Sequence, residues 1–560
     1  MRTAIQYVGQ KRPARRRSLN SLGSAAMMAV AAAGLTFNVA IADSGPVVGT
    51  VDGPVRGYSD KGVNIFLGIP YAAPPIGKLR WQPPAAMKRW KGTLDATHFG
   101  NTCPQVTELG AFAGPSSTSE DCLYLNVFTT GASKNGKKKP VIVWIHGGGN
   151  IDGETNDYDA SKLATGGPAG VPTVVVTLNY RLGILGFFSH PAINGEGHLW
   201  GNYGILDQQA ALRWVQRNIA AFGGDPNKVA LGGQSAGAVD TGANQVSPFA
   251  NGLFNRAIYQ SSPGFFSTLP SASDALAKGN KFATDAGCSG SNSDAASCLR
   301  KLSVARILQL QGTPNADGPY TAGAFVDGTV IPLTPEQAFT SGKFNKMPVI
   351  GGAVKDELTF TTGITEYFSG PPQAPMTADQ YAAAVTGPAA AQYPLSSFGG
   401  DTMLAYERYL TDPNKCRELH VVRLWAPQVP TYAYDFTYQN APYYFPKMPG
   451  FSPLAAHTID IQFLFANWHG GNLGVNIDQS SGQPRELNGQ ETKLSDQLVA
   501  AWTNFADKGN PNGSGNSPWP RFGNGKGAKY FVQDIPLSTT SIANFRNEYK
   551  CDFWDTQLTY

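Results

Sequence analysis

The chain has 560 residues, of which 42% are hydrophobic and only 15% are charged, and it contains 64 glycines and 40 prolines. This composition is typical of a loop-rich globular protein, and it excludes an intrinsically disordered chain and a coiled coil. The formal net charge is +4, but six basic residues lie before residue 18 and no acid lies before Asp43. The positive charge therefore does not indicate a nucleic-acid partner.

The N-terminal segment has the pattern of an export signal. Its basic residues precede an apolar run from Ala25 to Val39, and Ala40-Ile41-Ala42 follows as a cleavage site of the A-x-A type. Basic, apolar and small-residue regions in this order are typical of a secretory signal peptide. We therefore predict a signal peptide over residues 1–42, cleavage after Ala42, a single mature domain over residues 43–560, and a location in the periplasm or the medium.

Two alternatives concern the same segment. The apolar run is short and is interrupted by Gly34, Thr36 and Asn38, so we expect no stable membrane anchor. Arg15-Arg16-Arg17 is also compatible with a twin-arginine signal, and the route of export stays open.

The sequence contains an even number of cysteines, which favours disulfides in an exported chain. Six cysteines allow fifteen pairings. The short separations favour Cys103–Cys122 and Cys288–Cys298, which leaves Cys416–Cys551 by elimination. No C-x-x-C pair and no His/Cys cluster occurs, so we expect no metal site and no cofactor.

The first elements after the leader are expected to be short strands separated by turns, from Val47 to Gly100. Four prolines between Pro74 and Pro84 exclude a central helix or strand in that part. We expect it to wrap over the surface of a larger unit.

A buried strand followed by glycines comes next. Lys139 to Ile145 is a continuous apolar run, typical of a strand buried on both faces, and it ends in HGGGN at residues 146–150. Pro172 to Leu178 is a second run, rich in β-branched residues. Glycines directly after a strand let backbone N–H groups point into a cavity, as stabilisation of an oxyanion requires. A simple tight turn is the alternative interpretation of HGGG.

The next elements place a serine on a turn. A helix is predicted by the spacing of Leu206, Ala210, Trp214 and Ile219, and FGGDP at 222–226 ends it. Val229 to Leu231 predict a strand that runs into GGQSAG. A G-x-S-x-G pattern between a strand and a helix is the form of a nucleophile elbow, so Ser235 is the candidate nucleophile. Alone, the pattern is compatible with an ordinary glycine-rich turn. Together with HGGG upstream, it predicts a hydrolase of α/β architecture.

The remaining elements are predicted from shorter patterns. Further strands are expected at 255–263, 348–352 and 431–435, helices within 270–317, helices and capping loops within 361–400, and a closing helix at 501–512.

Several stretches resemble the type-B carboxylesterase/cholinesterase family. They are GIPYAAPPIGKLRW at 68–81, SEDCLYLNVF at 119–128 and the whole of 201–237. The resemblance implies an α/β-hydrolase fold, with a large, mostly parallel mixed sheet flanked by helices and capped by loops and helices. The elbow of the family usually reads G-E-S-A-G. Here Gln234 replaces the acid, so any role of a carboxylate beside the serine is absent.

The family resemblance also bears on structural residues. The pairs Cys103–Cys122, Cys288–Cys298 and Cys416–Cys551 agree with the vertebrate cholinesterase pattern. Arg80 with Glu120, and Arg181 with Asp207, stand where family members carry buried ion pairs, so we assign them no catalytic role.

A serine nucleophile needs a histidine base, and an α/β-hydrolase supplies its residues in the order serine, acid, histidine. Only His420, His457 and His469 follow Ser235. His457, in LAAHTIDIQFLF, matches the catalytic-histidine segment of the family. His469 is the second candidate, and a loop histidine is its alternative interpretation.

Glu357 is the candidate acid, because KDEL at 355–358 resembles the family segment KDEG. Asp356 is the alternative, but successive side chains leave the backbone in different directions, so only one of the two should face the histidine. Asp327 is more simply interpreted as a turn residue. By resemblance, the oxyanion hole uses the backbone N–H groups of Gly148, Gly149 and Ala236.

These residues predict a serine carboxylesterase that acts through an acyl-enzyme on a small-molecule ester. Cholinesterases bind a quaternary ammonium on a tryptophan inside the first disulfide loop. Residues 103–122 contain no tryptophan and only one aromatic residue, Phe112, so choline esters are not expected. Aliphatic or aryl esters, carbamates, a specialised natural ester such as a mycotoxin, and lipase substrates all stay open, as does the oligomeric state.

A non-catalytic binding protein on the same fold is a further alternative, because a fold does not imply a function. Such relatives typically lack the serine or the histidine. This chain has Ser235, Glu357, His457 and the glycines, which favours an enzyme.

Overall fold

The structure is a computed structural model. It describes residues 45–106, 115–132, 136–261, 269–312, 323–370, 373–466, 468, 475–523, 525 and 527–560. The predicted signal peptide and its cleavage site lie outside the described residues. Gly45–Tyr560 forms one compact unit.

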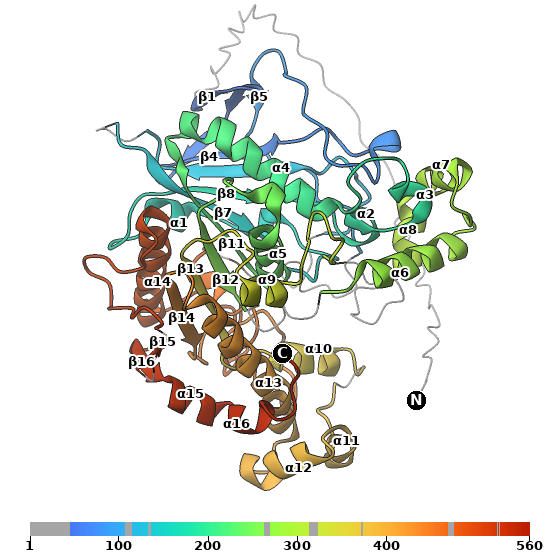
Figure 1. The fold of residues 1–560 in the computed structure, drawn as a ribbon. Helices are drawn as coiled ribbons and strands as arrows, with labels where there is room; N and C mark the ends of the chain where they lie inside the picture. The colour runs from blue at the N-terminus through green and yellow to red at the C-terminus, as the bar shows by residue number, and fades with distance from the viewer. Residues whose placement is uncertain are drawn as a thin grey trace, which may run out of the picture. The chain divides into compact units, whose positions relative to one another are not determined.

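The described residues form an eleven-stranded mixed sheet that runs through the molecule (Figure 1). Its order is β16-β15-β14-β13-β12-β11-β7-β8-β6-β4-β3. The strands are β3 (Tyr58–Asp60), β4 (Val63–Pro70), β6 (Tyr124–Thr129), β7 (Lys139–Ile145), β8 (Val174–Leu178), β11 (Gly224–Gln234), β12 (Arg256–Gln260), β13 (Val349–Val354), β14 (Thr431–Phe436), β15 (Lys529–Gln533) and β16 (Ser538–Ser541).

The seven central strands β8, β7, β11, β12, β13, β14 and β15 are parallel to one another. Towards one edge β6, β4 and β3 pair in antiparallel fashion, as does β16 at the other edge. Parallel strands need both faces covered, and the sequence provides for this. All seven residues of β7 are buried, as are all five of β8. Two smaller sheets consist of β1 (Val47–Thr50), β2 (Gly53–Arg56) and β5 (Leu94–Asp95), and of β9 (Phe187–Phe188) and β10 (Gly201–Asn202).

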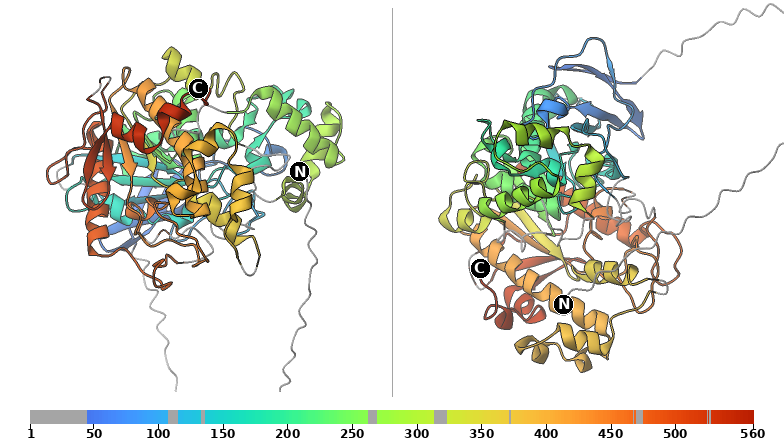
Figure 2. Two further views of the ribbon diagram at one scale, coloured as in Figure 1. Left: turned by 90° about the horizontal axis from the view of Figure 1, so that it is seen from below. Right: turned by 90° about the vertical axis from the view of Figure 1, so that its right-hand side faces the viewer.

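Helices cover both faces of the sheet (Figures 1 and 2). On one face lie α4 (Tyr203–Asn218), α5 (Ala236–Val246) and α13 (Thr402–Trp425), and on the other lie α1 (Ser161–Thr165) and α14 (Gly489–Lys508). Successive residues of β7 point to opposite faces of the sheet. Val143 packs in the hydrophobic cluster with α4 and α13, whereas Trp144 packs in the cluster with α14. This alternation follows from the two-residue period of a strand.

The other helices lie outside these layers. They are α2 (Gly183–Gly186), α3 (Pro191–Asn194), α6 (Ala272–Asp285), α7 (Ser293–Lys301), α8 (Val304–Gln311), α9 (Pro335–Ser341), α10 (Thr359–Tyr367), α11 (Ala378–Ala384), α12 (Pro388–Gln392), α15 (Ile542–Glu548) and α16 (Cys551–Trp554). Figures 1 and 2 show α6, α7 and α8 beside α2 and α3.

The proline-rich stretch 74–84 contains only a three-residue 3-10 turn, Gly77–Leu79, in agreement with the prediction. It is more than a surface wrap, however. Trp81 is fully buried, its indole N–H donates to the carbonyl of Ile184 at 2.9 Å, and its ring lies 4.6 Å from that of Phe188. Trp81 therefore anchors the stretch in the core.

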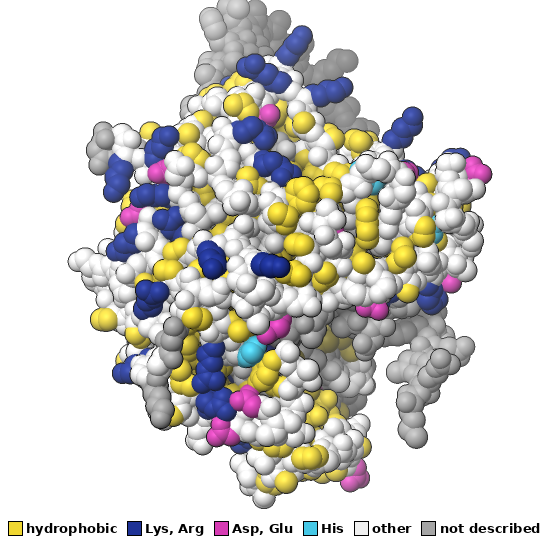
Figure 3. Space-filling model, viewed as in Figure 1, with side chains coloured by type: hydrophobic (Ala, Val, Ile, Leu, Met, Phe, Trp, Pro, Cys, Tyr) yellow, Lys and Arg dark blue, Asp and Glu magenta, His cyan; other side chains and the backbone are white. Residues whose placement is uncertain are grey.

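The three disulfides are Cys103–Cys122, Cys288–Cys298 and Cys416–Cys551, the pairing expected from the sequence. Among the described residues, no helix is both long and apolar enough to cross a bilayer. On the face seen in Figure 3, the Lys and Arg side chains are spread out and separated by uncharged and hydrophobic side chains.

Candidate active site

Three of the predicted site segments follow the carboxyl ends of parallel strands. The glycine run follows β7, Ser235 follows β11, and Glu357 lies three residues after β13. β7 and β11 are neighbours in the sheet, and β12 separates β11 from β13. Because parallel strands end at the same edge, these segments come together there, which is where open α/β sheets place their ligand sites.

Ser235 occupies a strained turn between β11 and α5. Its backbone angles are φ 57° and ψ −126°, a region that side-chain-bearing residues rarely adopt. The turn is fixed on both sides: the Ser235 N–H donates to Gln260 O at 2.9 Å, and the Ser235 carbonyl accepts from Ala238 N at 2.9 Å. The conformation of a nucleophile elbow, expected from GQSAG, is therefore present.

Gly233 and Gly237, which flank the serine turn, lie where neighbouring backbone leaves no space for a side chain. A Cβ on Gly233 would lie 2.4 Å from the carbonyl carbon of Gly237, and a Cβ on Gly237 would lie 2.1 Å from Ile145 O. No side chain fits at either position without movement of the backbone.

The glycine run after β7 forms a loop with positive φ at Gly148 (104°) and Gly149 (63°). A Cβ on Gly147 would lie 3.1 Å from the Cβ of Ser235, so this loop passes directly beside the serine. The N–H groups of Gly148, Gly149 and Ala236 donate to no acceptor among the described residues. Free N–H groups beside a serine are suited to binding an anionic oxygen.

A buried network holds the glycine loop, and the sequence alone did not reveal it. Tyr180 donates its hydroxyl to His146 O at 3.1 Å and to Asn150 Oδ1 at 3.0 Å, and Asn150 Nδ2 donates to Asp240 Oδ1 at 3.0 Å. The ring of His146 stacks on that of Tyr180, and burial lowers the pKa of His146 to about 4. His146 is thus a neutral structural residue at neutral pH.

Glu357 and His457 form a close pair. Glu357 Oε2 lies 2.5 Å from His457 Nδ1, and Glu357 Oε1 accepts from Val354 N at 3.1 Å. Burial alone would raise the pKa of Glu357, but the charge and the hydrogen bond of His457, together with the charge of Lys415, hold it below its ordinary value. Glu357 is therefore an ionised acceptor that fixes the proton of the imidazole on Nδ1.

Asp356 faces away from the imidazole. Its Oδ2 accepts from Ala455 N at 3.0 Å and from Gln439 Nε2 at 2.7 Å. It thereby ties the loop that carries Glu357 to the loop that carries His457. The two adjacent acids thus have different partners, as the alternation of side-chain directions predicts.

The other contacts of the His457 ring come from Gln234 and Phe360. Gln234 Nε2 lies 3.2 Å from His457 Nε2 and 3.4 Å from Nδ1, and Gln234 is only 1% exposed. The ring of Phe360 meets the imidazole edge to face at 5.4 Å. Tyr443 donates its hydroxyl to His457 O at 2.8 Å.

These residues surround a cavity of about 240 Å³. Its lining includes Ser235, His457, Gln234 and the run Gly147–Gly149. Aromatic side chains form another part of the wall, namely Tyr158, Phe360, Tyr444 and Trp468. The sequence did not single out the three acids that also line it, Asp152, Glu154 and Asp157. The sequence signal that could have revealed these acids is the stretch DGETND at 152–157, directly after HGGGNI at 146–151.

The alternative site residues lie elsewhere or outside the described residues. His420 lies on α13, with its Nε2 2.9 Å from Glu336 Oε1, and it does not line the cavity. Asp327 accepts from the N–H groups of Thr329 and Ile331, which is the role of a turn residue. His469 and Phe112 are outside the described residues.

The two expected ion pairs are buried and lie outside the cavity. Two guanidinium nitrogens of Arg80 lie 2.5 Å and 2.7 Å from the carboxylate oxygens of Glu120. Two guanidinium nitrogens of Arg181 lie 2.7 Å and 2.8 Å from the carboxylate oxygens of Asp207. Both arginines therefore bind their carboxylates through two nitrogens, the geometry of a structural clamp.

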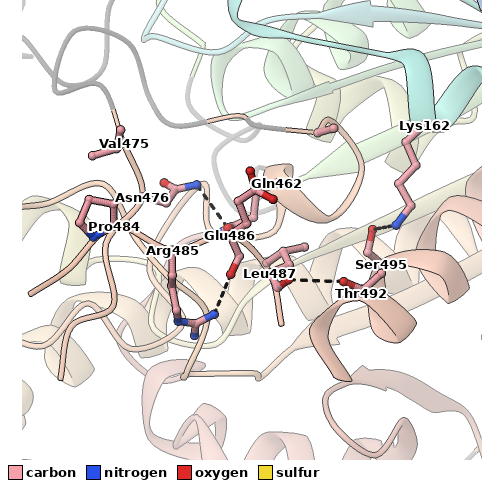
Figure 4. Close-up of a pocket in the computed structure, with 11 residues that line it drawn as sticks. Lys162, Gln462, Val475, Asn476, Pro484, Arg485, Glu486, Leu487, Thr492 and Ser495 are labelled. Atoms are coloured by element: carbon pink, nitrogen blue, oxygen red, sulfur yellow. Dashed lines mark hydrogen bonds between the residues drawn. The ribbon is translucent and has the colours of Figure 1, made fainter. Parts of the chain in front are cut away.

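A second cavity, of about 560 Å³, lies against α14 and contains none of the predicted catalytic residues (Figure 4). Its cations are compensated. Lys162 Nζ lies 2.7 Å from Ser495 Oγ and 2.8 Å from Asp496 Oδ1, and Arg485 pairs with Glu491 at 2.7 Å.

The chain resembles known proteins over most of its length. The model of the carboxylesterase family matches residues 44–554. The chain is 36% identical to a fumonisin B1 esterase of Sphingopyxis macrogoltabida, over 84% of each chain. It is 32% identical to the medium-chain fatty acyl-CoA hydrolase precursor of Anas platyrhynchos, over 94% of this chain and 95% of that protein. It is 33% identical to human carboxylesterase 3, over 92% and 91%.

The match covers nearly the whole described unit, and the relatives are named as hydrolases and esterases. The strand order and the strained serine turn are those of an α/β-hydrolase. The chain belongs to the carboxylesterase family and is a carboxylic ester hydrolase with the α/β-hydrolase fold.

Proposed function

We propose that Ser235, His457 and Glu357 are the catalytic triad of a serine esterase that works through an acyl-enzyme. The observation that carries the proposal is that Ser235, on its strained turn, and His457, paired with the buried Glu357, line one cavity. A hydroxyl is a weak nucleophile until a base takes its proton, and a carboxylate must hold that base in one tautomer.

In the first half of the proposed cycle, Ser235 Oγ attacks the ester carbonyl while His457 Nε2 accepts its proton. The tetrahedral intermediate collapses when His457 returns this proton to the leaving alcohol. The acyl group stays on Ser235 as an ester. Throughout, Glu357 accepts the Nδ1–H bond and stabilises the imidazolium that forms.

The oxyanion of the intermediate lies at the N–H groups of Gly148, Gly149 and Ala236. These groups have no described acceptor of their own, so they need no rearrangement before they bind the developing charge. Each donor contributes roughly 3 kcal/mol to stabilisation of the transition state.

In the second half, a water molecule attacks the acyl-enzyme, and His457 removes its proton. Collapse of this second intermediate breaks the Ser235–acyl bond and releases the carboxylic acid. The serine recovers its proton from His457, and the cycle closes without a metal or a cofactor in the proposed steps.

We propose a preference for short esters over the long chains of a lipase, because the cavity at Ser235 has a volume of only about 240 Å³. We also propose export, with a signal peptide over residues 1–42. Three disulfides in the described unit support an oxidising location.

The test is hydrolysis of p-nitrophenyl butyrate and p-nitrophenyl palmitate by purified residues 43–560 and by the Ser235→Ala variant. We expect hydrolysis of the butyrate, a loss of at least 1,000-fold in the variant, and weak activity on emulsified palmitate. Full activity of the variant would contradict the triad, and a preference for palmitate would make the protein a lipase.

A further inference from the structure

The cavity at Ser235 is acidic on one side. Asp152, Glu154 and Asp157 contribute to its lining, and its described lining contains no lysine and no arginine. His457, the proposed base, is the only basic side chain there. All three acids come from the segment that directly follows the glycine run, so they stand beside the proposed oxyanion hole.

Asp152 is buried without a partner. The residue is only 3% exposed, it lines the cavity, and its carboxylate makes no hydrogen bond with any described residue. Burial raises its pKa well above the ordinary value for an aspartate. Buried carboxylates are normally paired or hydrogen-bonded, because an isolated charge is costly to remove from water. Because Asp152 lines the cavity, a polar group of a bound ligand can reach its carboxyl.

Asp152 lies close to the glycine run. Its Oδ1 would lie 2.4 Å from a Cβ on Gly148. The carboxylate therefore packs against the backbone of one of the proposed oxyanion donors.

Asp157 and Glu154 extend the acidic side. Asp157 makes no side-chain hydrogen bond with a described residue, and burial raises its pKa to about 6. Glu154 is 5% exposed and accepts from the Thr102 hydroxyl and from Asn156 Nδ2, the latter at 2.9 Å. Among the described residues, no group of three His, Cys, Asp or Glu side chains is arranged to hold a metal ion.

We propose that the acidic side of this cavity binds a primary ammonium group of the substrate, so that the enzyme prefers esters whose acyl or alcohol part carries a protonated amine. The inference rests on the proposed function of Ser235. A primary ammonium offers three N–H donors, which match the unpartnered carboxylates of Asp152 and Asp157. The rings of Tyr158 and Trp468 line the same cavity and add cation–π attraction.

A bound ammonium also changes the protonation of Asp152. With a neutral ester, burial favours the protonated carboxyl, whereas a bound ammonium favours the carboxylate and is stabilised by it. The effect therefore appears in kcat/KM. A quaternary ammonium has no N–H donor, so it satisfies these carboxylates less well than a primary amine does.

The first test is a pair of substrate series at pH 7. On the alcohol side, 4-(aminomethyl)phenyl butanoate is compared with its neutral isostere, 4-ethylphenyl butanoate. On the acyl side, p-nitrophenyl 6-aminohexanoate is compared with p-nitrophenyl heptanoate. We expect kcat/KM for the ammonium ester to exceed that of its isostere at least 10-fold in one of the two series. Equal values in both series would overturn the inference.

The second test is substitution of the acids. Asp152→Asn and Asp157→Asn are expected to reduce the ammonium-to-isostere ratio at least 5-fold each. Asp159→Asn is the matched control, because Asp159 lies on the same segment, does not line the cavity, and already accepts from Ser161 N at 2.9 Å. It should leave the ratio unchanged. An unchanged ratio in both cavity variants would overturn the assignment to these carboxylates.

A binding measurement separates this inference from the proposed function. Calorimetry on the Ser235→Ala variant compares phenethylammonium with 2-phenylethanol, and we expect the cation to bind at least 10-fold more tightly. If neither ester is hydrolysed, the triad proposal fails, and this binding difference alone decides the ammonium site. If the neutral isosteres are hydrolysed but the cation has no advantage in rate or in binding, the triad stands and the ammonium site is overturned.

Discussion

The side-chain amide of Gln234 lies against the imidazole of His457, with its Nε2 3.2 Å from Nε2 and 3.4 Å from Nδ1 of the ring. Because Nδ1 faces the carboxylate of Glu357, the lone pair of the ring lies at Nε2, the atom that accepts the Ser235 proton in the proposed cycle. Gln234 is therefore a neutral neighbour of the proposed base. The family usually has a glutamate at this place.

The Gln234→Glu variant tests the consequence of that exchange. A carboxylate beside the ring favours the protonated imidazole, so the acid limb of the pH–rate profile should move to higher pH. We expect kcat/KM on the pH plateau to stay within about 10-fold of the wild type. The measurement is a pH profile of kcat/KM from pH 5 to 9. A plateau loss beyond about 100-fold, near 2.7 kcal/mol, would show that the neutral amide is required.

The two adjacent acids should respond differently to amide substitution. Glu357→Gln removes the charge that faces Nδ1, and we expect kcat to fall by roughly 10³–10⁴-fold. Asp356→Asn disturbs the bonds to Ala455 N and Gln439, so we expect a loss of unfolding free energy of about 1–3 kcal/mol and a much smaller fall in kcat. Steady-state kinetics and urea unfolding check this. The opposite order of the two kcat values would assign the acid to Asp356.

Two alanine variants test the glycine loop. A Cβ on Gly148 would lie 2.2 Å from Asp152 O, so Gly148→Ala should displace the loop and lower kcat by roughly 10²–10³-fold. A Cβ on Gly149 meets no atom within 4 Å, so Gly149→Ala carries mainly the cost of its positive φ, about 1–2 kcal/mol. We expect the fold loss in kcat of Gly149→Ala to be at least 10 times smaller than the fold loss of Gly148→Ala. Equal losses would place the oxyanion donors elsewhere.

Asp157 makes stability depend on pH. Its folded-state pKa is raised to about 6 by burial, whereas an unfolded aspartate titrates near 3.9. The protonated form is therefore favoured by folding: its contribution is fully present below about pH 4 and is lost as the pH rises through about 6.

Asp157→Asn removes this ionisation. The variant should gain on the order of 1–3 kcal/mol in unfolding free energy at pH 8 and little at pH 4. Urea unfolding of both proteins at the two pH values measures the difference. The same gain at both pH values would exclude ionisation as its cause.

The strands and the serine turn could be predicted from the sequence, because each depends on local patterns. Lys139 to Ile145 and Pro172 to Leu178 have the uninterrupted apolar runs that a doubly covered sheet requires, and they form β7 and β8. The glycines of GQSAG and HGGG mark the places where the backbone comes close to its neighbours.

Helix α13 was not predicted, although it has 24 residues. Pro413 lies inside it, and the buried face carries charges such as Lys415 and Glu418 where an apolar stripe would be expected. Lys415 Nζ lies 2.8 Å from Glu418 and 3.1 Å from Asp435 on β14. The compensating partner lies on another element, and no pattern along the helix could reveal it.

The residues of the proposed triad could be named from the sequence, but their surroundings could not. The order of Ser235, Glu357 and His457 follows the family pattern, and the structure brings these residues to one edge of the sheet. The burial of Asp152 without a partner, and the contact of Gln234 with His457, depend on side-chain directions that only the folded chain determines.

The identity of the nucleophile is tested most directly by covalent labelling. Purified residues 43–560 are treated with a fluorophosphonate, and the labelled peptide is identified by mass spectrometry, with Ser235→Ala as the control. We expect one phosphonyl adduct, on Ser235, and none on the variant. No adduct on the wild type, or an adduct that persists on another serine in Ser235→Ala, would contradict the assignment of Ser235 as the nucleophile.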